Sequence, residues 1–142
     1  MNSPSTKKNA FHKTFSKYRN TEVLTANKEA VLLLLYEGAV RFLKQAIQAL
    51  EKKDALEKSR LIGRTQDIIN ELSATLNYKT GGEIAGSLKS LYDFISDRLV
   101  AGNQDNNIEK LNEALGILVT LQEAWQQAIA SVKTENKTAE QR

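Results

Sequence analysis

The sequence predicts an all-α fold, an antiparallel up-down four-helix bundle with a short N-terminal arm or helix before it. Three observations support this prediction: four long segments repeat apolar residues at spacings of three and four, short connections separate them, and no segment alternates as a half-buried strand does. The only proline is Pro4, so none interrupts a helical segment. With 142 residues, the chain is long enough for one domain with its own hydrophobic core.

The first helical segment runs from about Asn27, its expected N-cap, to Lys53, and it carries two adjacent apolar stripes. A surface helix of a small bundle needs only one such stripe and a flank to reach its core. Two stripes therefore indicate a helix that either is buried on most sides or also faces a partner. The first stripe consists of Leu33, Tyr36, Val40, Leu43, Ile47 and Leu50, and the second consists of Leu32, Leu35, Ala39, Phe42, Ala46 and Ala49.

The second and third helical segments are bounded by end signals. Asp54 and Glu57 have the spacing of a capping box, which starts a helix that runs to about Leu76. The third segment follows the pair Gly81-Gly82, which is expected to form a turn, and it ends near Gly102. The apolar positions are Leu61, Ile62, Ile68, Ile69, Leu72 and Leu76 in the second segment, and Ile84, Leu88, Leu91, Tyr92, Ile95 and Leu99 in the third.

The fourth helical segment starts after Asp105 or Asn106 and, like the first, has a wide apolar sector. One stripe keeps a heptad spacing with Gln122 as its polar member, and a second stripe lies beside it. Residues 1–22 are thus expected to form a basic aromatic arm, residues 23–132 the four-helix bundle, and residues 133–142 a flexible polar tail. The two stripes are Ile108, Leu111, Leu115, Leu118, Trp125, Ile129 and Val132, and Ala114, Ile117, Leu121, Ala124 and Ala128.

The N-terminal arm concentrates the positive charge of the chain. The net charge is +3, and five basic residues precede the first acid, Glu22, so the remainder carries −2 and is not a basic nucleic-acid-binding domain. Phe11, Phe15 and Tyr18 fall at helical spacing in the arm, which is either a disordered leader or a short amphipathic segment that packs onto another surface. The longest apolar run, Ala30–Tyr36, is too short to span a bilayer, so no stable membrane insertion is expected.

Residues that support catalysis or metal binding are scarce. Cysteine is absent, His12 is the only histidine, and no Asp or Glu falls on the apolar stripes. A di-metal site in a bundle needs Glu-x-x-His pairs that point inward, and acid–base catalysis needs a positioned carboxylate or imidazole. We therefore expect no enzymatic activity, no metal and no cofactor, and we expect a binding function instead.

A series of short motifs follows a fixed order along the chain: Tyr18 with Val23-Leu24-Thr25-Ala26, Leu35-Tyr36-Glu37-Gly38-Ala39, Asp67-Ile68-Ile69-Asn70-Glu71-Leu72, Gly81-Gly82-Glu83-Ile84-Ala85, Leu91-Tyr92-Asp93 with Arg98-Leu99, and Ala124-Trp125. From about Tyr18 to Ala130, this series resembles the FliS family, the flagellin-specific export chaperones. Two positions depart from the family pattern. Asn27-Lys28 stands where the family often has Ser-Pro, and Glu37 stands where it often has Asp.

The resemblance implies a monomeric four-helix bundle in the bacterial cytosol that binds the C-terminal segment of flagellin, which is disordered before assembly. Such binding prevents premature polymerisation and helps to deliver flagellin to an export gate component of the flagellar type III secretion apparatus. The resemblance also implies that the N-terminal segment can cover the hydrophobic client site when that site is empty. The wide apolar sectors and the aromatic arm agree with this expectation.

The partner-binding surface is predicted on the wide stripes and the arm, at Tyr18, Leu32, Leu35, Tyr36, Ala39, Tyr92, Ile95, Leu99, Ile117 and Leu121. The predicted lid over that surface consists of Phe11, Phe15 and Tyr18. An alternative function is that of a homodimeric structural or interaction module, because exposed apolar helix faces also form homodimers. Attachment to nucleic acid or to a membrane through the arm is a weaker alternative, because the arm is short and the bundle is not basic.

Overall fold

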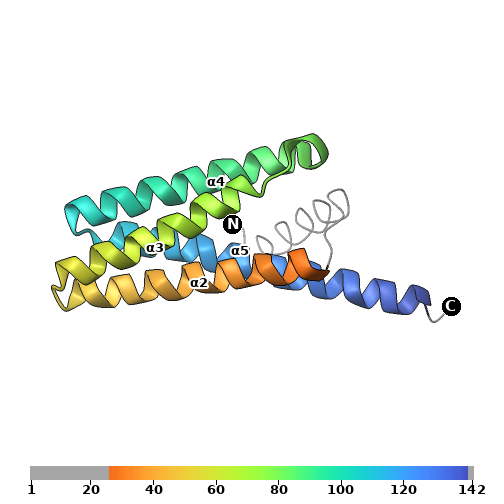
Figure 1. The fold of residues 1–142 in the computed structure, drawn as a ribbon, viewed down its shortest axis with the longest axis horizontal. Coiled ribbons are helices and arrows are strands. Elements are labelled where there is room, and N and C mark those ends of the chain that lie inside the picture. Colours follow the sequence, from red (N-terminus) through yellow and green to blue (C-terminus); the bar gives the residue numbers. More distant parts are fainter. Residues whose placement is uncertain (1–25, 141–142) are drawn as a thin grey trace, which may run out of the picture.

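The computed structural model describes residues 26–140, and over this range the chain forms four helices and no strand (Figure 1). Successive helices run in opposite directions, and each packs against two neighbours, so that they follow one another around the bundle. The predicted all-α four-helix bundle is confirmed, whereas Phe11, Phe15 and Tyr18 lie outside the described residues. The helices are α2 (Ala26–Glu51), α3 (Ala55–Ala74), α4 (Tyr78–Asp105) and α5 (Ile108–Glu140).

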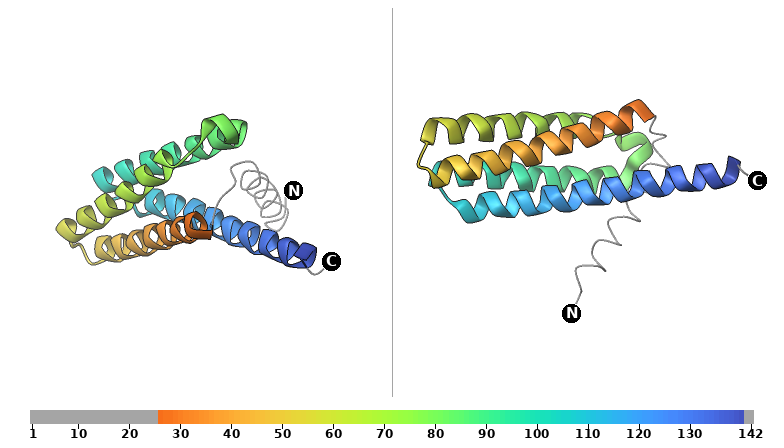
Figure 2. Two further views of the ribbon diagram at one scale, coloured as in Figure 1. Left: turned by 45° about the vertical axis from the view of Figure 1, so that its right-hand side comes forward. Right: turned by 90° about the horizontal axis from the view of Figure 1, so that it is seen from below.

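The bundle has a closed end and an open end. The α2–α3 and α4–α5 connections lie together at the closed end (Figure 1). There, the buried Lys58 of α3 donates hydrogen bonds to the main-chain oxygen of Asn103, at 3.0 Å, and to the side-chain oxygen of Asn106. Toward the α3–α4 connection, the pair α3–α4 diverges from the pair α2–α5 (Figures 1 and 2). The helix pairs are therefore farther apart at the open end than at the closed end.

Side chains from all four helices form the hydrophobic core. In the second apolar stripe of α2, Leu32 and Leu35, near the open end, are half-buried, whereas Ala39 and Ala46, nearer the closed end, are fully buried. Phe42 lies between the two alanines on the same stripe and packs against the core while remaining partly exposed. The largest fully buried side chains are Trp125, Tyr36, Tyr92, Leu43, Ile69, Leu72, Leu88, Ile95, Leu99, Leu111 and Leu118.

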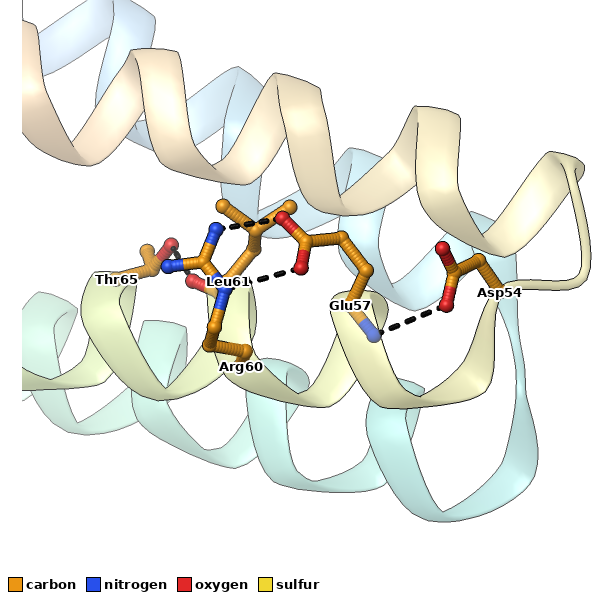
Figure 3. Close-up of polar contacts among 5 residues, drawn as sticks. All are labelled: Asp54, Glu57, Arg60, Leu61 and Thr65. Carbon is orange, nitrogen blue, oxygen red and sulfur yellow. Dashed lines mark hydrogen bonds and ion pairs between the residues drawn. The ribbon is translucent and has the colours of Figure 1, made fainter.

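Asp54 is the N-cap of α3, as predicted. Its Oδ1 accepts a hydrogen bond from the main-chain N–H of Glu57 at 3.2 Å (Figure 3). The reciprocal half of the capping box is not formed, because the main-chain N–H of Asp54 donates to the main-chain oxygen of Ala49 at 2.9 Å. The Glu57 carboxylate instead accepts hydrogen bonds of 3.0 and 2.5 Å from the Arg60 guanidinium. Hydrogen bonding from Arg60 lowers the pKa of Glu57 from its ordinary value of 4.5. The stabilisation from this exposed pair is therefore fully present at pH values above the ordinary pKa of 4.5, and it is lost as the pH falls through the lowered pKa of Glu57.

α4 begins before the glycine pair that was expected to precede it. Asn77 is the N-cap, and its side-chain oxygen accepts hydrogen bonds from the N–H groups of Lys79 and Thr80. Gly82 lies at a kink inside the helix with φ of 51° and ψ of −124°. The turn predicted at the glycine pair is therefore present at Gly82, and the short helical segment 78–81 before it was not predicted. Glycine permits the positive φ, so the helical conformation is interrupted there and the long part of α4 follows.

Gly102 allows a close contact between helices and is not the end signal that the sequence suggests. α4 continues to Asp105, and Asn106 ends it in the left-handed conformation, with φ of 50°. A Cβ atom at Gly102 would lie 2.6 Å from Cδ2 of Leu111 and 3.3 Å from the main-chain oxygen of Asn107. The glycine is therefore needed because the start of α5 packs directly against α4.

The other helix ends differ from the sequence expectation by a few residues. α2 begins at Ala26, so Asn27 lies within its first turn and is not its N-cap. α5 begins at Ile108, close to the predicted start, where the side-chain oxygen of Asn107 accepts hydrogen bonds from the N–H groups of Glu109 and Lys110. The same helix continues to Glu140, through residues that the sequence predicts as a polar tail.

We predict that Gly102→Ala destabilises the bundle by roughly 1–3 kcal/mol, because the added methyl group overlaps Leu111 and α5 must shift. Gly63→Ala is the matched control. A Cβ at the exposed Gly63 in α3 would contact nothing within 4 Å, so this substitution is expected to stabilise the protein by roughly 0.5–1 kcal/mol. Urea denaturation followed by circular dichroism measures both. Equal effects of the two substitutions would contradict the close contact at Gly102.

Candidate functional site

The open end of the bundle contains a pocket with a volume of about 430 Å³, here called the end pocket. Its base is formed by Leu88, Tyr92 and Trp125, which are almost completely buried. Its mouth is formed by exposed residues, among them Val31, whose side chain is 55% exposed. Three helices and the α3–α4 connection contribute: the lining residues are Asn27, Lys28, Val31, Leu32 and Leu35 from α2, Thr75 and Leu76 from the connection, Leu88 and Tyr92 from α4, and Trp125 from α5.

The end pocket is mostly apolar. Its polar lining residues, Asn27, Lys28 and Thr75, are all exposed and so lie at its mouth. The volume falls within the range of about 300–1,000 Å³ that is usual for ligand sites, and an apolar lining with polar groups at the edge is typical of such sites. This arrangement suits apolar side chains of a partner better than a charged small molecule.

A hydrogen bond between two tyrosines lies beside the base of the end pocket. The hydroxyl oxygens of Tyr36 in α2 and Tyr92 in α4 are 2.5 Å apart, and both residues are almost completely buried. Tyr36 follows Leu35 of the pocket lining, and Tyr92 is itself a lining residue. The bond therefore links a helix that forms the mouth of the pocket to a helix that forms its base.

A second, shallower depression runs between α4 and α5 and is here called the lateral groove. Its volume is about 560 Å³, and Phe94, with a side chain 42% exposed, lies in it. Next to the groove, the Arg98 guanidinium lies 5.1 Å from the centre of the Phe94 ring and 3.7 Å from the Glu113 carboxylate. The lining residues are Leu91, Phe94, Asn112, Glu113, Gly116, Ile117, Thr120 and Leu121.

The structure separates the predicted partner-binding residues into three groups. Leu32, Leu35 and Tyr92 line the end pocket, and Ile117 and Leu121 line the lateral groove. The remaining described residues are completely buried in the core, so a partner would reach them only through a change in the bundle. These buried residues are Tyr36, Ala39, Ile95 and Leu99, and Tyr18 lies outside the described residues.

Several lining residues were not among the predicted ones. Val31 and Phe94 lie off the apolar stripes, so the sequence contains no signal that places them in a pocket. Leu76, Leu88 and Trp125 lie on the stripes, where the simplest interpretation is that they fill the core. They line the end pocket although Leu88 and Trp125 are almost completely buried, and helical periodicity alone does not report how far two helix pairs diverge.

The described part of the chain contains neither a metal-binding cluster nor a membrane-spanning helix. Among residues 26–140, no group of three or more His, Cys, Asp or Glu side chains is arranged so that it could hold a metal ion. None of the four helices is long and apolar enough to cross a membrane.

Comparison with known proteins places the chain in a family. The family model for the flagellar protein FliS matches residues 11–132. The chain belongs to the FliS family. The match includes every residue that lines the end pocket and the lateral groove. It also begins at Phe11, upstream of the Tyr18 at which the sequence resemblance starts, so the three aromatic residues of the arm fall within the family match.

Characterised members of the FliS family are similar to this chain over most of its length. The flagellar secretion chaperone FliS of Bacillus subtilis is 33% identical over 89% of this chain and 93% of its own length. The chaperone FliSB of Pseudomonas aeruginosa is 36% identical over 73% of this chain and 82% of its own length. The chaperone FliS of Salmonella typhimurium is 35% identical, with 74% and 78% of the two chains covered.

Proposed function

We propose that this FliS family member is an export chaperone that binds the C-terminal segment of flagellin in the bacterial cytosol. It prevents premature polymerisation and passes flagellin to an export gate component of the flagellar type III secretion apparatus. The observation that carries the proposal is the end pocket, an apolar cavity between diverging helix pairs in a chain whose relatives are named flagellar secretion chaperones. The chaperone acts as a monomer in this proposal.

The energetics of binding a disordered client favour a long apolar contact. Ordering the backbone of a client costs about 1–2 kcal/mol per residue, so ten residues cost roughly 10–20 kcal/mol. At about 25 cal/mol per Å² of buried apolar surface, roughly 400–800 Å² must be buried to offset that cost. A single pocket that holds a few side chains is too small for this, and a helical client would place successive anchors along a longer surface.

The lateral groove offers that additional surface. The two depressions use neighbouring faces of the same helix, because Leu88 and Tyr92 of α4 line the end pocket, while Leu91 and Phe94 line the lateral groove. A client that fills the end pocket and continues around α4 would therefore reach Ile117 in the groove. In this arrangement the end pocket holds the client's main apolar anchor, and the lateral groove supplies the remaining contact area.

The proposal is tested at Val31, which lines the end pocket but is 55% exposed, so that a charge there is compatible with folding. Val31→Asp is expected to weaken binding of the C-terminal flagellin segment about tenfold or more, because a carboxylate must then be desolvated against an apolar client. Isothermal titration calorimetry with that segment measures the loss.

The matched control for Val31→Asp is Leu56→Asp. Leu56 is 85% exposed in the first turn of α3, at the closed end of the bundle, so its substitution introduces the same charge away from both depressions. The control should bind flagellin as the unsubstituted chain does. Failure of the unsubstituted chain to bind the segment would contradict the proposed function. A stable homodimer in sedimentation, unchanged when the flagellin segment is added, would favour the alternative function of a homodimeric interaction module.

The arm is proposed as a lid on the client site. Burying Phe11, Phe15 and Tyr18 would contribute roughly 1.5–3 kcal/mol each, whereas ordering about ten residues costs on the order of 10 kcal/mol or more. These opposing free energies are similar, so a longer client can displace the arm. The family match begins at Phe11, which supports a shared role for these three side chains.

Deletion of residues 1–21 is therefore expected to tighten flagellin binding severalfold and to increase aggregation of the free protein. The reason is that the client no longer competes with the arm and that apolar surface stays uncovered. Calorimetry and light scattering measure the two effects. Unchanged or weaker flagellin binding by the truncated chain would mean that the arm is a permanent part of the bundle or of the client site.

A further inference from the structure

The Tyr36–Tyr92 hydrogen bond connects two helices that do not pack against each other. α2 contacts α3 and α5, and α4 contacts the same two helices, whereas α2 and α4 stand diagonally across the bundle. The two hydroxyl groups nevertheless meet at 2.5 Å in the bundle interior. The bond is therefore a direct link between diagonally opposite helices, beside the end pocket that Tyr92 lines.

The position of this bond relates it to the shape of the end pocket. α2 supplies Leu32 and Leu35 to the pocket, and Tyr36 comes directly after them; α4 supplies Tyr92 itself. The distance between α2 and α4 at this level determines how wide the pocket is. Apolar contacts are not directional and tolerate small shifts of one helix against another, whereas a hydrogen bond has a narrow range of length and angle.

We infer that the Tyr36–Tyr92 hydrogen bond sets the spacing of α2 and α4 at the base of the end pocket, and that both tyrosines are positioning residues for client binding. This inference rests on the proposed function, because it assigns the client to that pocket. Tyr92 lines the end pocket and also forms the hydrogen bond, whereas the buried Tyr36 does not line the pocket and affects the client only through Tyr92. The hydroxyl groups are thus required for the shape of the site.

The test compares Tyr36→Phe, Tyr92→Phe and the double variant Tyr36→Phe/Tyr92→Phe. Phenylalanine keeps the ring and removes only the hydroxyl, so each variant loses the same bond. All three should bind the C-terminal flagellin segment about fivefold more weakly than the unsubstituted chain, and the double variant should be no weaker than either single one. Tyr78→Phe, at a 51% exposed tyrosine at the start of α4, is the matched control and should leave binding unchanged.

A second measurement needs no client. Trp125 is the only tryptophan of the chain and lines the same pocket, so quenching of its fluorescence by acrylamide reports on how open the pocket is. Relative to the unsubstituted chain, acrylamide quenching should change by the same amount in all three variants and stay unchanged in Tyr78→Phe. The measurement is made at a temperature at which circular dichroism shows that every variant is folded. Unchanged quenching, or losses of affinity that add up in the double variant, would overturn the inference. If the unsubstituted chain binds no flagellin, the proposed function fails, while the quenching result still decides whether the bond sets the pocket.

Discussion

Ile95→Asp is expected to unfold the bundle, whereas Ile117→Asp is expected to leave it folded and to weaken client binding. Ile95 is completely buried in α4, so aspartate there would place a carboxylate without a counter-charge inside the core. An unpaired buried charge costs about 3–5 kcal/mol, and loss of the buried isoleucine side chain costs about 2–5 kcal/mol more. Together these costs amount to most or all of the stability of about 5–15 kcal/mol that is usual for a domain. Circular dichroism at 222 nm and urea denaturation measure the outcome.

The contrasting expectation for Ile117 follows from its place in the lateral groove. Ile117 is half-buried and faces a depression on the surface, so a carboxylate there remains hydrated in the free protein. Its variant should keep the helical signal and the urea midpoint close to those of the unsubstituted chain, while flagellin binding weakens. A folded Ile95→Asp variant with intact binding would show that the described core is wrong, and an unfolded Ile117→Asp variant would place that residue in the core.

Trp125→Ala is expected to cost about 3–5 kcal/mol of the free energy of unfolding. Trp125 has the largest of the fully buried side chains, 1% exposed, and its removal leaves a cavity that opens into the end pocket. Because the variant lacks the only tryptophan, the urea transition must be followed by circular dichroism. Phe94→Ala is the control, since its partly exposed ring lies in the lateral groove and its loss should cost about 1 kcal/mol or less. Similar costs for the two substitutions would contradict the role of Trp125 in the core.

The helices could be predicted from the sequence because helical periodicity is a local property. Each apolar stripe spans several turns, so an error at one position does not remove the helix, and Asp54 adds a local hydrogen bond that starts α3. The two glycine positions in α4 were less predictable. A glycine is equally expected where a helix ends, where it is interrupted as at Gly82, and where another helix comes close as at Gly102.

The candidate site was only partly predictable, because it depends on how the helices are arranged. The second stripe of α2 contains both Leu35, which lines the end pocket, and Ala39, which is buried in the core. Both positions satisfy the same periodicity, and only the divergence of the helix pairs separates them (Figure 2). Val31 lies off both stripes and was missed for the same reason, since its role at the mouth of the pocket comes from the neighbouring α3–α4 connection.

The most direct test of the account is the fluorescence of Trp125 during a titration with a tryptophan-free C-terminal segment of flagellin. Trp125 is the only tryptophan of the chain and forms part of the base of the end pocket, so its emission reports on the surroundings of that base. If the client anchors there, the emission should change with added segment and saturate at one segment per chain, and the change should be weakened in Val31→Asp but not in Leu56→Asp. A complex that forms in sedimentation while the Trp125 emission stays constant would contradict the end pocket as the client site.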